Sequence, residues 1–249
     1  MEQVTATNPE AAAPAAFEDR LEGIISIHKR GLNGDASAVK EADRLLEALR
    51  SDFPNRPIAD AYHGSTMVLV ARDKSRPFDK LKWSRNGLKL LDKAVAADPG
   101  NLTIRLLRGK AAFQLPEKYF QRTQTAIEDY TYLLNREGKQ RFLGSRESLR
   151  MNYELGEAYR KIGRNADAIA VWKQMLDQTQ DPQLQQLLQH RVRVLEGRPA
   201  VEEVQTVDPV SVIWGRAASA TGNALINWVI RQETGTSKKK KRKKKRKKR

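Results

Sequence analysis

The chain has 249 residues, of which 39% are hydrophobic, and it contains no cysteine. This composition can bury a core, and the length fits one elongated repeat domain or one to two compact domains. Because cysteine is absent, disulfides, thiolate nucleophiles and Cys-based zinc sites are excluded. The formal net charge is +16, but the last twelve residues are all cations, so the rest of the chain carries only +4.

Residues 1–15 are rich in Ala, Pro and Thr. They lack the basic and apolar regions of a secretory signal peptide, so we expect a flexible leader and a cytoplasmic protein. Residues 16–196 carry apolar side chains at three- and four-residue spacing, without the alternation typical of strands, and so predict an all-α domain. Pro and Gly mark the expected helix ends. These breaks are Phe53-Pro54-Asn55, Asp98-Pro99-Gly100-Asn101, Gly163 and Asp181-Pro182.

Four segments of this domain share one spacing. A small residue is followed four positions later by a large one and three later by another apolar residue, which places all three on one helix face. The small residue would let two helix backbones approach closely, and the large one would fill the groove beside it. The sets are Ala42/Leu46/Leu49, Gly87/Leu91/Ala94, Ala126/Tyr130/Leu133 and Ala168/Trp172/Met175.

Residues 149–181 combine one of these sets with an upstream Leu-Gly pair and a tyrosine. Leu155, Gly156, Tyr159, Ala168 and Trp172 stand at separations that resemble the tetratricopeptide repeat (TPR) family. The resemblance extends in more divergent form over most of 16–196. The other matching small-residue positions are Gly64, Gly87, Gly109 and Ala126.

The TPR resemblance implies an α-solenoid of antiparallel helix pairs, in which stacked first helices line a concave surface that holds a protein or peptide. Stretches at 72–78 and 116–120 are extra to the pattern and should lengthen loops or helices within a unit. Several polar residues on predicted first helices are candidates for contacting an acidic peptide in this groove, although solvated charges on a helix surface need no ligand. These candidates are Arg105, Arg108, Lys110, Asn152 and Arg160.

No catalytic pattern emerges, so we expect a non-enzymatic protein without metal or cofactor. The sequence lacks a phosphate-binding glycine loop, a His-Glu-x-x-His motif and a nucleophile elbow. The three histidines, His28, His63 and His190, fall on separate predicted helices and are better explained as surface or hydrogen-bonded core residues than as ligands.

Residues 197–209 read as a linker and 210–232 as an amphipathic helix. The apolar run 210–230 is long enough to span a bilayer, but Arg216, Asn223 and Asn227 within it argue against spanning. Trp214, Leu225 and Trp228 share one face, which suits a helix lying at a membrane interface. The alternatives are a cap on the repeats and a helix that binds a partner or a second copy.

Residues 233–249 should be disordered because adjacent like charges repel. A polybasic run can be a simple solubility tail, can bind an anionic membrane surface, or can bind nucleic acid or the ribosome. Its position after a Trp-bearing segment favours peripheral attachment at the inner face of the membrane. The sequence therefore predicts a protein-binding adaptor tethered to membrane, with a nucleic-acid- or ribosome-associated protein as the alternative. The polyanion-binding residues are Lys238, Lys239, Lys240, Lys241, Arg242, Lys243, Lys244, Lys245, Arg246, Lys247, Lys248 and Arg249.

Overall fold

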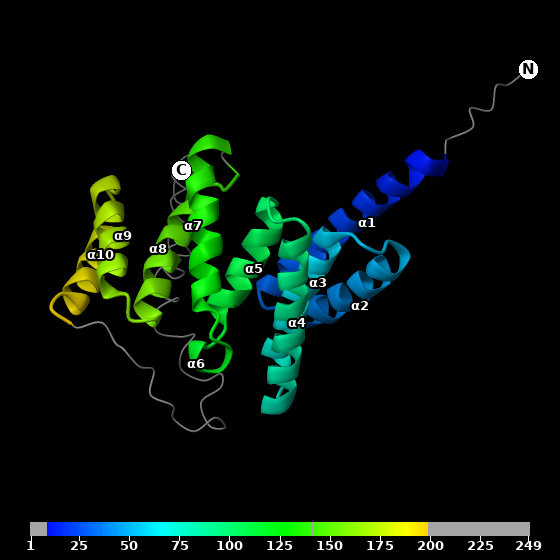
Figure 1. Ribbon diagram of the computed structural model, residues 1–249, viewed down its shortest axis with the longest axis horizontal. Helices are drawn as coiled ribbons and strands as arrows, with labels where there is room; N and C mark the ends of the chain where they lie inside the picture. Colours follow the sequence, from blue (N-terminus) through cyan, green and yellow to red (C-terminus); the bar gives the residue numbers. More distant parts are fainter. Residues whose placement is uncertain (1–8, 141, 199–249) are drawn as a thin grey trace, which may run out of the picture. The chain divides into compact units, whose positions relative to one another are not determined.

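The structure, a computed structural model, describes residues 9–140 and 142–198 (Figure 1). Every regular element in these ranges is an α-helix, as the sequence predicts. Contacts divide the chain into two compact units, one reaching to Ala112 and one starting at Phe113. The sequence predicts one continuous repeat domain over 16–196. Continuity of a repeat stack from one unit into the other remains a prediction.

The first unit is built from four long helices and the start of a fifth. Helix α1 packs on α2 and α3, α2 packs on α3, and α3 packs on α4. One core cluster of this unit joins α1, α2 and α3 around Phe17, Leu46, Leu49 and Tyr62. The helices are α1 (Pro9–Leu32), α2 (Ala36–Asp52), α3 (Pro57–Asp73), α4 (Pro77–Ala97) and α5 (Leu102–Gln114), and the boundary between the units falls within α5.

Helix α3 is buried on almost its whole circumference, from Ala59 to Ala71, because other helices of the first unit cover it on several sides. A helix in this position has no solvent face on which to place its polar residues. Asp60, His63 and Ser65 are therefore drawn into the interior, where each needs a hydrogen-bonding or charged partner. This is why the polar chemistry of the first unit gathers around α3.

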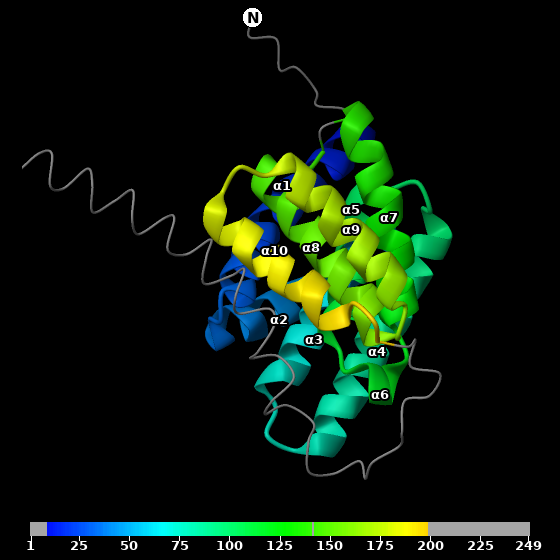
Figure 2. The ribbon, with the colours of Figure 1, turned by 90° about the vertical axis from the view of Figure 1, so that its left-hand side faces the viewer.

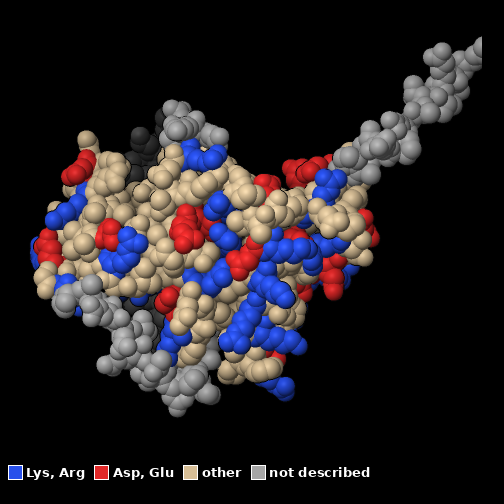
Figure 3. Space-filling model, viewed as in Figure 1, with Lys and Arg blue, Asp and Glu red and all other residues tan. Residues whose placement is uncertain are grey.

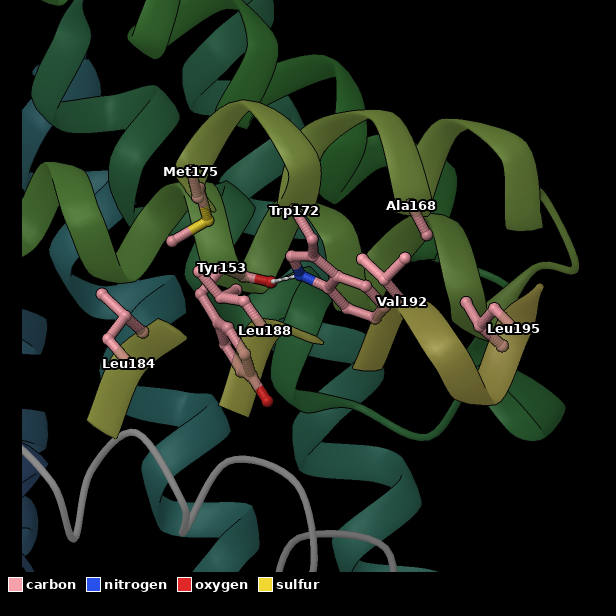
Figure 4. Close-up of a cluster of buried hydrophobic side chains, with 8 residues drawn as sticks. All are labelled: Tyr153, Ala168, Trp172, Met175, Leu184, Leu188, Val192 and Leu195. Atoms are coloured by element: carbon pink, nitrogen blue, oxygen red, sulfur yellow. Dashed lines mark hydrogen bonds between the residues drawn. The ribbon is translucent and has the colours of Figure 1, made fainter. Parts of the chain in front are cut away.

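The second unit contains α6 to α10. Helix α7 packs on α8, α8 on α9, and α9 on α10 (Figure 2). Figure 4 shows the core between the last three, in which Leu184, Leu188 and Val192 of α10 lie against Trp172 and its neighbours. The helices are α6 (Glu117–Phe120), α7 (Thr123–Gln140), α8 (Ser145–Lys161), α9 (Asn165–Gln178) and α10 (Pro182–Leu195).

Helix ends follow local signals. The four predicted breaks are confirmed: Phe53 follows the last residue of α2, Pro99 lies between α4 and α5, and Gly163 separates α8 from α9 with a φ of 77° that favours glycine. At the start of α10, the Asp181 carboxylate accepts hydrogen bonds from the backbone N–H groups of Gln183 and Leu184, as an N-cap does.

The N-terminal boundary needs a correction. Helix α1 begins at Pro9, so residues 9–15, assigned to a flexible leader by the sequence, are helical. Proline fits the first position of a helix, and the alanines that follow have the highest helix propensity. The rest of the expected leader, 1–8, lies outside the described residues, as do most of the linker (199–209), the predicted amphipathic helix and the polybasic run.

The two stretches that exceed the repeat pattern take different forms. Residues 72–78 contain the end of α3 and the start of α4, with only Lys74 to Arg76 between the two helices. The additional residues therefore lengthen the helices of this hairpin, and α4 reaches 21 residues. Residues 117–120 form the short helix α6 instead.

Candidate functional site

Two of the small residues predicted to mediate packing meet in the first unit. Gly64 on α3 and Gly87 on α4 are both buried, and a Cβ atom built on Gly64 would lie 2.7 Å from the Gly87 carbonyl oxygen. The reciprocal distance, from a Cβ on Gly87 to the Gly64 carbonyl oxygen, is 2.5 Å. Both obstructing atoms belong to backbone, so only glycine fits at either position without moving a helix.

The second unit has a related contact between α8 and α9. Gly156 lies against the indole of Trp172, whose Nε1–H donates a hydrogen bond to the carbonyl oxygen of Tyr153 at 3.4 Å (Figure 4). Trp172 is fully buried. The remaining predicted packing residues are buried or partly buried: Gly109, Ala126, Leu155, Tyr159 and Ala168.

The candidate groove residues divide between the units. Arg105, Arg108 and Lys110 lie on α5 within the first unit and are partly buried. The Arg105 guanidinium donates from Nε to the Pro99 carbonyl oxygen at 2.7 Å. Arg108 forms an ion pair with Asp92 on α4, with 3.5 Å between Nη1 and Oδ1. These two arginines therefore have structural partners within the unit.

Asn152 and Arg160 lie on α8 in the second unit. The Asn152 amide donates to the Ser148 carbonyl oxygen at 3.0 Å, one turn back along the helix. Arg160 donates from Nη2 to the buried Glu157 carboxylate at 2.8 Å. Arg105, Arg108, Asn152 and Arg160 are thus engaged with their own chain. Capture of an acidic peptide by the candidate groove residues remains a prediction.

A charged cluster surrounds His63 in the first unit. Asp60 forms ion pairs with Arg50 on α2 and with Lys93 on α4. In the second pair, 3.2 Å separates Lys93 Nζ from Asp60 Oδ2. Arg50 Nη1 also lies 2.9 Å from His63 Nδ1, and His63 Nε2 lies 3.2 Å from Asp43 Oδ1. Because arginine can only donate hydrogen bonds, His63 Nδ1 must accept the one from Arg50. The ring proton is therefore on Nε2, which donates a hydrogen bond to Asp43. The cluster joins α2, α3 and α4 and leaves His63 no free ring nitrogen.

His28 on α1 is a separate buried histidine. Its Nε2 lies 3.1 Å from the Ser65 hydroxyl, and its ring packs edge-on against Tyr62. Burial disfavours the charged imidazolium and lowers the pKa of His28 to about 4. His28 is therefore neutral at physiological pH. His190, by contrast, is exposed on α10.

The second unit holds two buried carboxylates on α8. Glu154 accepts a hydrogen bond from the Tyr130 hydroxyl at 2.8 Å and another from Arg150 Nε at 2.8 Å. Burial, and after it the neighbouring Glu154 charge, raises the pKa of Tyr130 well above its usual value. Glu157 faces Arg160 and also Arg191 of α10, whose Nε lies 3.3 Å from a Glu157 oxygen. Each carboxylate is paired with a cation.

Lys161 is the described amine with the most strongly altered pKa. Burial lowers it to about 8, a value at which lysines in enzymes act as bases or nucleophiles. Its Nζ, however, donates to the Phe113 carbonyl oxygen at 2.6 Å and lies 3.9 Å from the centre of the Phe113 ring. These contacts give Lys161 a structural role, because they link α8 to the end of α5 within the second unit.

These buried polar groups form structural pairs, and none of them combines a nucleophile with a free base. Within 9–140 and 142–198 there is no cluster of His, Asp and Glu that could hold a metal ion. In the same ranges no helix has both the length and the apolar content to cross a membrane. The run 210–230 and its predicted membrane face, Trp214, Leu225 and Trp228, lie outside those ranges.

One surface feature is not among the expectations from the sequence. Seen from one side, Lys and Arg side chains gather over α4 (Figure 3), and three of the exposed cations on this helix are Lys82, Arg85 and Lys89. They continue a row that begins at Phe78, whose side chain is 74% exposed. The sequence does contain a signal for this row: Phe78 and the three cations are spaced by four, three and four residues, which places them on one helix face.

Comparison with known proteins gives no relative: no family model, no curated protein and no solved structure matches the chain. The packed helix pairs are compatible with a helical repeat, and the resemblance to the TPR family rests on the residue pattern alone.

Proposed function

We propose that this protein is a non-catalytic adaptor that attaches to an anionic membrane surface through its C-terminal part. The attaching residues are the apolar segment 210–230 and the polybasic run 238–249. The helical body would carry a protein partner to that surface. A polybasic segment next to an apolar one supports this proposal, because stable peripheral attachment takes two membrane-directed signals.

The observation that carries the proposal is the position of α10. Its residues Leu184, Leu188, Val192 and Leu195 pack into the same core as Trp172 and Met175 of α9 (Figure 4). The last helix pair, α8 and α9, is therefore already covered on this side by α10. A further helix is not needed there as a cap, which supports a different role for 210–230 and favours the lipid-facing interpretation.

The role of the helical body as a protein carrier is supported by its packing. In both units, small residues bring neighbouring helices together, at Gly64 with Gly87 and at Gly156 with Trp172. Helices held this way are rigid supports for exposed side chains, as in repeat proteins that bind segments of other proteins. The proposal does not depend on Arg105, Arg108 or Arg160, since each of these has an intrachain partner.

The test compares the intact chain with a chain ending at Thr236, which keeps every described residue. Each is sedimented with vesicles of phosphatidylcholine and phosphatidylserine, and separately with duplex RNA at matched salt. The proposal expects vesicle binding that needs the removed residues and also weakens when Trp214 and Trp228 are both changed to alanine. Equal vesicle binding by both chains would refute the tail as a tether. RNA binding that needs the tail but ignores the tryptophan changes, without vesicle binding, would establish the nucleic-acid alternative instead.

A further inference from the structure

The α4 helix carries an exposed row of Phe78, Lys82, Arg85 and Lys89, here called the α4 stripe. An α-helix turns by about 100° per residue, so the four positions lie within about 60° of one another and extend over about 16 Å. The opposite side of α4 buries Gly87 and Leu91 against Gly64 of α3. The stripe therefore faces solvent for three turns of the helix.

The three cations of the stripe are available to a ligand. Within the described ranges, no hydrogen bond or ion pair engages the side chains of Lys82, Arg85 or Lys89. This contrasts with Lys93, further along α4, which is paired with Asp60. The stripe cations are thus uncompensated charges.

The hairpin around the stripe is strongly basic as well. Residues 72–89 contain seven cations and two carboxylates. One of the carboxylates, Asp73, is bonded to Arg72 at 2.8 Å, and the other, Asp79, is in the first turn of α4, where the helix dipole favours a negative charge. Lys74 lies over the ring of Trp83, with Nζ 5.3 Å from its centre. Trp83 in turn packs against Val39, Leu69 and Val70, so the hairpin is anchored to the body of the unit.

Phe78 distinguishes the stripe from an ordinary solvated helix face. It is the most exposed large hydrophobic side chain of the described residues, and it lies in the first turn of α4, where the hairpin turns. Moving such a side chain out of water stabilises a bound state. Each basic residue close to an anionic membrane adds to that stabilisation.

We propose that the α4 stripe is a second contact with anionic membrane, separate from the C-terminal tether. The Phe78 ring enters the interfacial layer, and Lys82, Arg85 and Lys89 face the headgroup phosphates. The arrangement favours membrane over nucleic acid because the aromatic ring stands at one end of the row. Single-strand binding surfaces interleave aromatic rings with cations so that successive bases can stack.

A fluorescent probe at position 78 tests this contact directly in the full chain. The natural chain has no cysteine, so Phe78→Cys can be labelled at one site with an environment-sensitive dye. Ala97→Cys is the matched control, since it is exposed on the same helix about 28 Å away. With vesicles that contain phosphatidylserine, the emission of the dye at position 78 should shift to shorter wavelength and become about twofold or more brighter, as expected when a probe enters an interfacial layer. The probe at 97 should not change.

Charge reversal supplies the second measurement. Lys82→Glu with Arg85→Glu should weaken vesicle binding of the full chain by about tenfold or more, given about 1 kcal/mol per cation. The control, Lys40→Glu with Arg44→Glu on exposed positions of α2, changes the net charge by the same amount. Equal weakening in both variants would overturn the proposal, because it would show an effect of total charge only.

The outcome separates the stripe from the tail. If the intact chain sediments with vesicles while the probe at 78 stays in water, the stripe proposal is wrong and the tail proposal stands. If the chain ending at Thr236 still shows the shift at 78, the stripe acts without the tail. A shift at 78 with duplex RNA but not with vesicles would overturn the membrane assignment.

Discussion

The backbone of Gly64 touches the backbone of Gly87 where α3 crosses α4. A Cβ on Gly64 would lie 2.7 Å from the Gly87 carbonyl oxygen, closer than real Cβ atoms approach any backbone atom. The contact brings α4 close enough to bury α3 on nearly all sides. Burial of α3 in turn forces Asp60 and His63 to find partners on α2 and α4. One small-residue contact thus underlies the polar cluster of the first unit.

Replacing Gly64 by alanine should destabilise the protein despite the better helix propensity of alanine. The propensity gain is about 1 kcal/mol, and overpacking against an immovable backbone costs about 1–3 kcal/mol. The same change at Gly23 in α1, where a Cβ meets nothing within 4 Å, should stabilise by up to about 1 kcal/mol. Urea unfolding of the two variants measures the difference. Stabilisation by both changes would contradict the close contact.

In the second unit, Gly156→Ala should destabilise because its Cβ would collide with the Trp172 indole. Trp172→Leu alone should cost about 2–4 kcal/mol, because a fully buried ring is lost. In the double variant the smaller leucine leaves room for the new methyl group. The two changes should therefore cost less together than the sum of the single effects, by about 1 kcal/mol or more. Additive free energies of unfolding would show that the residues do not collide.

Local signals made much of the fold predictable. Pro54, Pro99, Gly163 and Pro182 mark helix ends because their backbone preferences act over one or two residues. The TPR resemblance likewise selected Gly64 and Gly87 without knowledge of their contact. The pattern could not show that contacts divide near Ala112, because both units are built from the same kind of helix.

The partners of buried polar residues depend on tertiary structure. His63 and Asp60 lie on a helix that is apolar on several sides, so the sequence alone does not say which side meets Arg50 or Lys93. The pair of Arg160 with Glu157 is different, because it spans only three residues of α8 and its spacing was readable from the sequence. The α4 stripe, in contrast, needed only the helical register of Phe78 and the cations after it.

Lowering the pH should reduce the free energy of unfolding, in part because of His28. Its pKa is about 4 in the folded state and about 6.5 when unfolded, so the unfolded state takes up a proton first as pH falls. The stabilising effect is complete above about pH 6.5 and is lost between about 6.5 and 4, amounting to about 3 kcal/mol over that window. Comparing urea unfolding of the wild type at pH 7 and at pH 4.5 measures the loss.

His28→Gln isolates this contribution, because glutamine can still bond Ser65 but does not titrate. The variant should lose less stability than the wild type between the two pH values, whatever its stability at pH 7. His190→Gln, on the exposed face of α10, should keep the wild-type dependence. An unchanged slope in His28→Gln would mean that His28 is not held neutral by burial.

The pairing around Asp60 should matter more than a surface ion pair. Asp60→Ala leaves Arg50 partly buried without its carboxylate and should cost about 2–3 kcal/mol. The matched change is Asp52→Ala, which removes a solvent-exposed pair with Arg20 and should cost under about 1 kcal/mol. Thermal unfolding of both variants checks the order, and a larger loss in Asp52→Ala would contradict it.

Competition between vesicles and RNA tests whether the C-terminal residues attach the protein to an anionic membrane. The intact chain is mixed with phosphatidylserine-containing vesicles and duplex RNA at equal phosphate concentration, and the vesicles are floated through a density gradient. If the C-terminal residues attach the protein to the membrane, the intact chain rises with the vesicles, while the chain ending at Thr236 rises much less. An intact chain that stays at the bottom with the RNA would contradict it.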